Sequence, residues 1–130
     1  MSFESIIEKV ENVITKLGVD PVQARTENKG QWNISKDQSI QLMIDVWEEN
    51  GYHFFQALTY VCPVGDDSRP DFFKFLLQEN HGLCETAFTI LDENVFLKYT
   101  TEADEISEET IYKGIRRVAY YNEIFRQKLG

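Results

Sequence analysis

The sequence of 130 residues predicts an α+β fold, in which a twisted, mainly antiparallel sheet of five strands carries helices packed against it. Stretches near both ends place apolar residues every three or four positions, as amphipathic helices do. Between them lie stretches that alternate apolar and polar residues, as half-buried strands do. Tight-turn signals join these stretches as hairpins. The expected order is α-β-β-β-α-β-β-α, within a single domain over residues 1–130.

The first helix is expected to begin after Ser2, whose side chain can cap it, and to end before Gly18. Its apolar positions form one continuous stripe: Phe3, Ile6, Ile7, Val10, Val13, Ile14 and Leu17. Such a helix lies on a surface with its stripe inward. Residues 19–30 are expected to be a polar connection, followed by a short strand over 31–35 with Trp32 and Ile34 on one face.

The clearest strand covers residues 39–49, and Asn50-Gly51 after it is a strong signal for a two-residue hairpin loop. This loop sets the register with the next strand. One face then pairs Val46 with Phe55, Ile44 with Ala57 and Leu42 with Thr59. The other face pairs Trp47 with Phe54, Met43 with Leu58 and Gln41 with Tyr60. Both faces of the hairpin therefore carry large apolar groups.

The first helix can cover only one of these two faces. The second face is either covered by another element of the chain or is a contact surface for a partner or a second copy. Left uncovered, its apolar residues would form a larger patch than scattered exposed apolar side chains normally do: Met43, Trp47, Phe54, Leu58 and Tyr60. Both alternatives are open from the sequence.

A middle helix is expected to start at Pro70 and to end at Gly82. Its apolar residues lie almost all the way round it: Phe72, Phe73, Phe75, Leu76 and Leu77. A helix that is apolar on most sides is buried on most sides. It is therefore either sandwiched within the monomer or part of an oligomer interface.

Two strands over 86–90 and 95–99 are expected to follow, with a two-residue loop at Glu93-Asn94 that pairs Ile90 with Leu97 and Phe88 with Tyr99. The last helix is expected to begin after Ser107 as its N-cap. Acidic residues lie in its first turn and basic residues near its end, both favoured by the helix dipole. Its inner stripe is Ile111, Ile115, Val118, Asn122, Phe125 and Leu129.

Residues with catalytic or ligand chemistry are few. His81 and Cys84 lack the further ligands that a closed metal site needs, and His81 fits the end of a helix. Cys84 follows a helix C-terminus, where the dipole disfavours a thiolate, so we expect Cys62 and Cys84 to be reduced and buried. No phosphate-binding loop or hydrolase motif is present. We therefore expect no enzyme, no cofactor and no metal.

The net charge of −9 argues against binding to nucleic acid or to an anionic membrane, since both need a positive surface. The first residues lack the basic lead and apolar core of a signal peptide, and no apolar run is long enough to span a membrane. These observations predict a cytoplasmic protein.

The segment FFKFLLQENHGLCETAFTILDENVFLKYTTEADEISEETIYKGIRRVAYYNEIF resembles the C-terminal half of YbjN-type domains, in the type III secretion chaperone-like superfamily. The similarity consists of a leucine-rich helix ending on Asn80, two strands around an acidic turn, an acidic linker and a long final helix. The resemblance implies a twisted antiparallel sheet with helices against it and no catalytic residues. Secretion chaperones are small, acidic and dimeric, and they hold a non-globular segment of another protein. The YbjN-type branch is associated with sensory or stress regulation.

We therefore predict a non-enzymatic protein-binding domain, chaperone-like or a regulatory adaptor, acting as a homodimer with a protein or peptide client. The predicted contact residues are Met43, Trp47, Phe54, Leu58 and Tyr60 on the hairpin, with Phe72, Phe73 and Leu76 on the middle helix. The alternative is a small-ligand sensor in which the same aromatic residues line an apolar pocket between helices and sheet.

Overall fold

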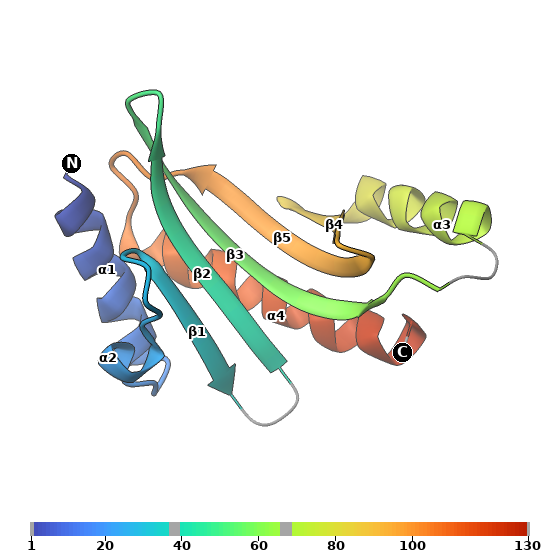
Figure 1. The fold of residues 1–130 in the computed structure, drawn as a ribbon, viewed down its shortest axis with the longest axis horizontal. Helices are drawn as coiled ribbons and strands as arrows, with labels where there is room; N and C mark the ends of the chain where they lie inside the picture. Colours follow the sequence, from blue (N-terminus) through green and yellow to red (C-terminus); the bar gives the residue numbers. More distant parts are fainter. Residues whose placement is uncertain (1, 37–39, 66–68, 130) are drawn as a thin grey trace.

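The computed structural model describes residues 2–36, 40–65 and 69–129. Its strands form one antiparallel sheet in the order β1-β2-β3-β5-β4 (Figure 1). The strands are β1 (Gln31–Lys36), β2 (Ile40–Glu49), β3 (Tyr52–Pro63), β4 (Thr86–Leu91) and β5 (Asn94–Glu102). The helices are α1 (Phe3–Lys16), α2 (Pro21–Ala24), α3 (Arg69–Gly82) and α4 (Glu108–Leu129). The predicted α+β class is confirmed.

The predicted polar connection over 19–30 contains one further element, the single turn α2. The Asp20 side chain accepts a hydrogen bond from the backbone N–H of Val22, and Pro21 occupies the first helical position. Both residues favour a helix start, so this turn follows from ordinary capping chemistry.

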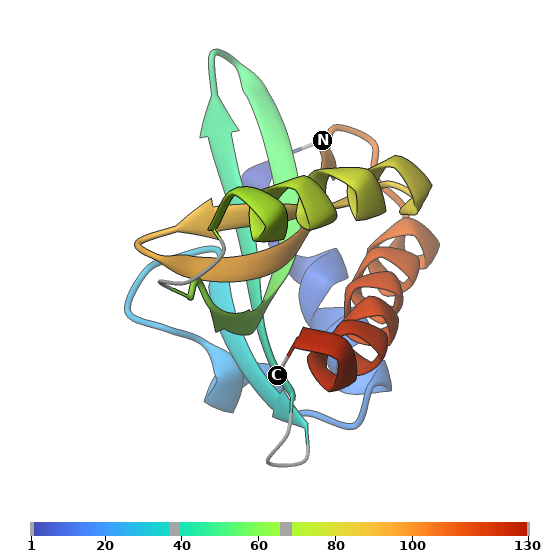
Figure 2. The same cartoon turned by 90° about the vertical axis from the view of Figure 1, so that its right-hand side faces the viewer.

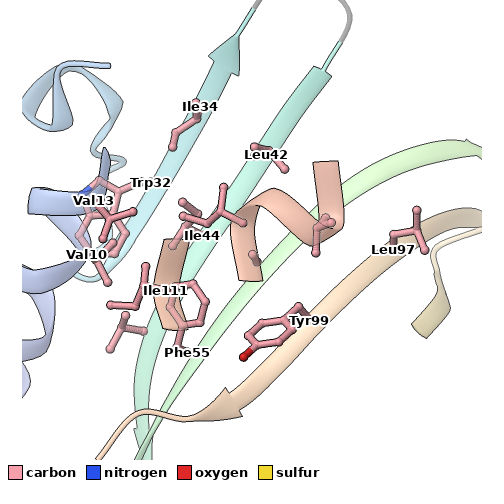
Figure 3. Packing of buried hydrophobic residues seen from close by; sticks show 14 of the residues in the cluster. Val10, Val13, Trp32, Ile34, Leu42, Ile44, Phe55, Leu97, Tyr99 and Ile111 are labelled. Carbon is pink, nitrogen blue, oxygen red and sulfur yellow. The ribbon is translucent and has the colours of Figure 1, made fainter. Parts of the chain in front are cut away.

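Helices α1 and α4 both lie on the same face of the sheet (Figure 2). Most residues of their predicted inner stripes are buried there, against side chains from the central strands (Figure 3), while Phe3, Ile7, Leu17 and Leu129 are partly buried. The largest fully buried side chains come from α1, α4 and four of the five strands: Ile6, Ile14, Trp32, Ile44, Phe55, Leu97, Ile111 and Ile115. The apolar core therefore lies between this face and the two helices, and the face is called the covered face below.

Helix α4 lies close to the sheet at Gly114. A Cβ atom at this position would lie 2.7 Å from the Tyr99 ring, which is closer than side chains pack. Nearby, the buried Asn122 side chain donates hydrogen bonds to the Thr59 hydroxyl at 3.0 Å and to the Tyr60 carbonyl at 2.9 Å. These contacts set the height of α4 over β5 and β3.

The hairpin of β2 and β3 has the predicted register, from the pair Leu42–Thr59 to the pair Trp47–Phe54. Its loop residues Asn50 and Gly51 have φ values of 55° and 85°, as a type I′ turn requires. The local turn signal therefore fixes which side chains share a face over most of both strands.

The predicted register of β4 and β5 is wrong by two residues. Phe88 pairs with Leu97 and Ile90 with Val95, because the loop residues are Asp92 and Glu93 rather than Glu93 and Asn94. Both loop residues have positive φ, and the Asn94 side chain donates to the Asp92 carbonyl just outside the loop. A shift of two leaves every side chain on its predicted face.

Candidate protein-binding surface

The second face of the sheet, called the open face below, carries the predicted hairpin residues. Met43, Trp47, Phe54 and Leu58 are partly exposed, and Tyr60 is 43% exposed. Since α1 and α4 pack on the covered face, and α3 packs beside β4, no described helix lies over β2 and β3 on the open side (Figure 2). The structure therefore brings these five side chains together on one uncovered surface.

The aromatic residues of the open face form two contacts at opposite ends. Trp47 stacks on Phe54 with ring centroids 5.7 Å apart, and Tyr60 meets the edge of Phe96 at 6.1 Å. Phe96 lies on β5 opposite Tyr60 and was not among the predicted residues. Placing it requires the pairing of β3 with β5, which no local turn signal specifies.

Between these two aromatic contacts, a polar row crosses the open face. The Gln31 amide donates to Asp45 Oδ1 at 2.8 Å, and the Gln56 amide donates to Asp45 Oδ2 at 2.9 Å. The three residues lie side by side on β1, β2 and β3, because Asp45 pairs with Gln31 on one side and with Gln56 on the other. The open face is thus two apolar groups separated by a carboxylate held between two amides.

The predicted residues of the middle helix lie in a different region. Helix α3 packs against β4, so β5 and β3 separate it from the Met43 and Trp47 side chains on β2 (Figure 1). Phe72 and Phe73 are partly exposed, whereas Leu76 is 4% exposed and belongs to the core. Leu77, which the prediction left out, is 71% exposed. The predicted contact residues therefore form two separate regions.

Helix α3 also covers the outer edge of β4. The Asn80 side chain accepts from the Phe88 backbone N–H at 2.6 Å and donates to the Phe88 carbonyl at 3.4 Å. The amide of Asn80 thus takes the place of a neighbouring strand at that residue. Two exposed apolar side chains, Ile90 and Leu91, follow at the end of the same strand.

The pKa shifts of Asp104 and Cys62 follow from contacts and burial within the fold. His53 Nδ1 lies 3.0 Å from Asp104 Oδ1, and its backbone N–H donates to Asp104 Oδ2, which together lower the pKa of the Asp104 carboxyl. Burial raises the pKa of the Cys62 thiol, which disfavours the nucleophilic thiolate. The prediction that both cysteines are buried is wrong for Cys84, which is exposed just before β4. Its backbone N–H donates to the Tyr121 hydroxyl.

Neither a metal cluster nor a membrane-spanning helix is found in the described ranges. No three His, Cys, Asp or Glu side chains gather there as ligands would, and none of the helices is long and apolar enough to cross a bilayer. The aromatic residues of the open face lie across the sheet from α1 and α4. They consequently do not line a pocket between helices and sheet, as the ligand-sensor alternative requires.

The arrangement of strands and helices is that of the type III secretion chaperones. One chain in the structure of the ExsC–ExsE complex is similar at a TM-score of 0.72, with 12% sequence identity over 98% of this chain and 96% of that one. A chain of the HopA1–SchA chaperone–effector complex is similar at 0.71, with 10% identity over 98% of both chains.

A third similar structure is that of the Yersinia pestis type III secretion chaperone SycH with a fragment of YscM2. The TM-score is 0.65 and the identity 13%, over 92% of this chain and 98% of that one. No protein-family model and no curated protein matches the sequence. At 10–13% identity these likenesses show the fold alone.

Proposed function

We propose that this chain is a non-enzymatic, chaperone-like domain that binds a non-globular segment of another protein on its open face. The observation that carries the proposal is the uncovered apolar surface of β2, β3 and β5, on a fold whose structural neighbours include chaperones in complex with effectors. Aromatic and methionine side chains suit such a role because they offer large and adaptable contact area. We also propose that the chain belongs to the YbjN-type branch, on the sequence similarity of the segment from Phe72 to Phe125.

The second part of the proposal is a homodimer formed through α3 and β4. Leu77 is 71% exposed, Leu91 60% and Ile90 45%, while Phe72 and Phe73 are partly exposed on the same helix. Apolar side chains gathered at one end of a sheet are typical of a subunit contact. This region is separate from the open face, so a dimer leaves both open faces available to clients.

Binding of a non-globular client is tested with reduced and carboxymethylated α-lactalbumin, a chain without a stable fold. We expect Trp47→Ala to weaken its binding about tenfold, because aromatic residues that a partner covers often carry much of the binding free energy. Tyr120→Ala is the matched control, since Tyr120 is an exposed aromatic residue on α4. Equal binding by the parent protein and both variants, measured by fluorescence anisotropy, would remove the open face from the proposal.

The homodimer is tested by sedimentation of the parent protein, Leu77→Glu and Val22→Glu. Leu77→Glu places a charge in the proposed contact and is expected to yield monomers. Val22→Glu places the same charge on an exposed apolar residue of α2, beside β1 at the other edge of the sheet, and serves as the control. A parent protein that sediments as a monomer at every concentration would disprove the dimer and leave the client-binding part of the proposal standing.

A further inference from the structure

The polar row across the open face sets its binding preference. Asp45 lies in β2 with Trp47 two residues after it and Met43 two residues before it. Residues two apart on a strand are spaced about 7 Å along it and share a face. The Asp45 carboxylate therefore lies between an apolar group of Trp47 and Phe54 and a second group of Met43 and Leu58.

The carboxylate of Asp45 is held in place but has no cation beside it. Its two hydrogen bonds come from neutral amides, and no Lys, Arg or His of the described chain forms an ion pair with it. Each carboxylate oxygen can accept more than one hydrogen bond. With one amide on each oxygen, acceptor capacity remains for a donor arriving from the solvent side. The amides hold the group in position before a partner arrives.

The charges around this row are mainly negative. Glu102 pairs with Phe54 across β3 and β5, and Glu49 lies two residues beyond Trp47, so both belong to the open face. The basic residue Lys98 lies on β5, opposite Leu58. It is two strands away from Asp45, and it is two residues before Thr100, which pairs with Gln56 in the row of Asp45. The protein as a whole carries −9. An acidic partner segment is disfavoured here, and a basic one is attracted.

We propose that the open face selects segments with a Lys or Arg between apolar side chains, and that Asp45 receives the cation. This rests on the proposed function, because it specifies the client of the same surface. The flanking apolar side chains lie on the Trp47–Phe54 and Met43–Leu58 groups. Asp45 is a specificity residue: a client with no cation at this place would bury a carboxylate without a counter-ion, so it binds more weakly than a client that carries the cation there.

The same geometry disfavours a second copy of the chain on the open face. Two open faces in contact would bring two acidic rows together, and like charges in a desolvated interface repel strongly. The occupant is therefore a partner of opposite charge.

The test is a selection from a random displayed peptide library on three proteins: the parent, Asp45→Asn and Glu123→Gln. Glu123 is an exposed acid on α4 and controls for the loss of one charge. The parent and Glu123→Gln are expected to enrich peptides with Lys or Arg flanked by apolar residues. Asp45→Asn is expected to enrich apolar peptides without the basic residue.

Affinity measurements on one selected peptide complete the test. Replacing its basic residue by norleucine should weaken binding to the parent about tenfold and leave binding to Asp45→Asn unchanged, because a charge-assisted hydrogen bond is lost only where the carboxylate is present. The norleucine peptide tests the parent protein directly, so the result does not depend on the folding of the variant. Apolar peptides without basic enrichment on the parent would overturn this inference and leave the proposed function intact.

Three other results would also be decisive. Enrichment of acidic peptides, or loss of peptide binding through self-association of the parent as its concentration rises, would overturn the assignment of Asp45. If every selected peptide binds Trp47→Ala as tightly as the parent, the proposed function and this inference are both overturned.

Discussion

The two faces of the sheet are built from the same strands and differ in what their side chains do. On the covered face, Ile44, Phe55 and Leu97 are fully buried under α1 and α4. On the open face, large apolar residues alternate with a carboxylate, amides and a lysine along the same strands. Burial under helices demands an almost wholly apolar face. A surface that stays in water and meets a partner can keep polar groups, and these are where its selectivity lies.

Phe54 and Phe55 test the difference between the two faces most directly, since they are adjacent and point to opposite faces. We expect Phe55→Ala to lower the free energy of unfolding by about 3–5 kcal/mol, because it leaves a cavity in the core. Phe54→Ala removes a partly exposed ring stacked on Trp47 and should cost about 1 kcal/mol. Urea denaturation followed by circular dichroism measures both.

Equal losses for the two phenylalanine variants would mean that the open face is covered in the folded protein. A second check uses client binding, which Phe54→Ala should weaken and which Phe55→Ala should leave intact wherever that variant stays folded.

The parts of this arrangement that the sequence predicts are those with local signals. Asn50-Gly51 specifies the β2–β3 register, so the faces of Phe54 and Phe55 follow from the sequence alone. Phe96 and the Gln31–Asp45 contact depend on pairing between strands whose connections carry no such signal, and they emerge only from the fold. The sequence also does not predict that Leu76 is buried and Leu77 exposed, because a helix that is apolar all round does not reveal which side is covered.

On the covered side, one ion pair makes the stability of the protein depend on pH, with a smaller effect than the loss of Phe55. The Arg25 guanidinium lies 2.7 Å from the Glu11 carboxylate, and the Trp32 indole N–H also donates to it. The pKa of Glu11 lies below its ordinary value of 4.5. The hydrogen bond from Arg25 is the main cause, and the bond from Trp32 adds to it. The Trp32 bond ties α1 to β1, and the Arg25 bonds tie α1 to the end of α2.

Because the folded pKa of Glu11 is lowered, its contribution to stability is present above pH 4.5 and is lost as the pH falls through the folded pKa. We expect Glu11→Gln to lower the melting temperature at pH 7. On acidification to pH 3, the melting temperature of this variant should fall less than that of the parent protein. Arg25→Gln should act in the same direction, since it removes the same ion pair. Melting curves of the parent and both variants across this range measure the effect, and parallel curves for parent and Glu11→Gln would contradict it.

The smallest expected change in stability comes from Phe96, and its effect on binding tests how far the binding surface extends across the open face. Its ring meets the edge of Tyr60 across β3 and β5, and its side chain is only partly buried. We expect Phe96→Ser to lower the free energy of unfolding by less than about 1 kcal/mol, as for other cross-strand pairs. Binding of carboxymethylated α-lactalbumin should nevertheless fall, because the second aromatic contact is lost. Binding by Phe96→Ser at the parent level, together with weaker binding by Trp47→Ala, would mean that the client contacts only β2 and the part of β3 around Phe54. The Asp45 row would then be the border of the binding surface and not its centre.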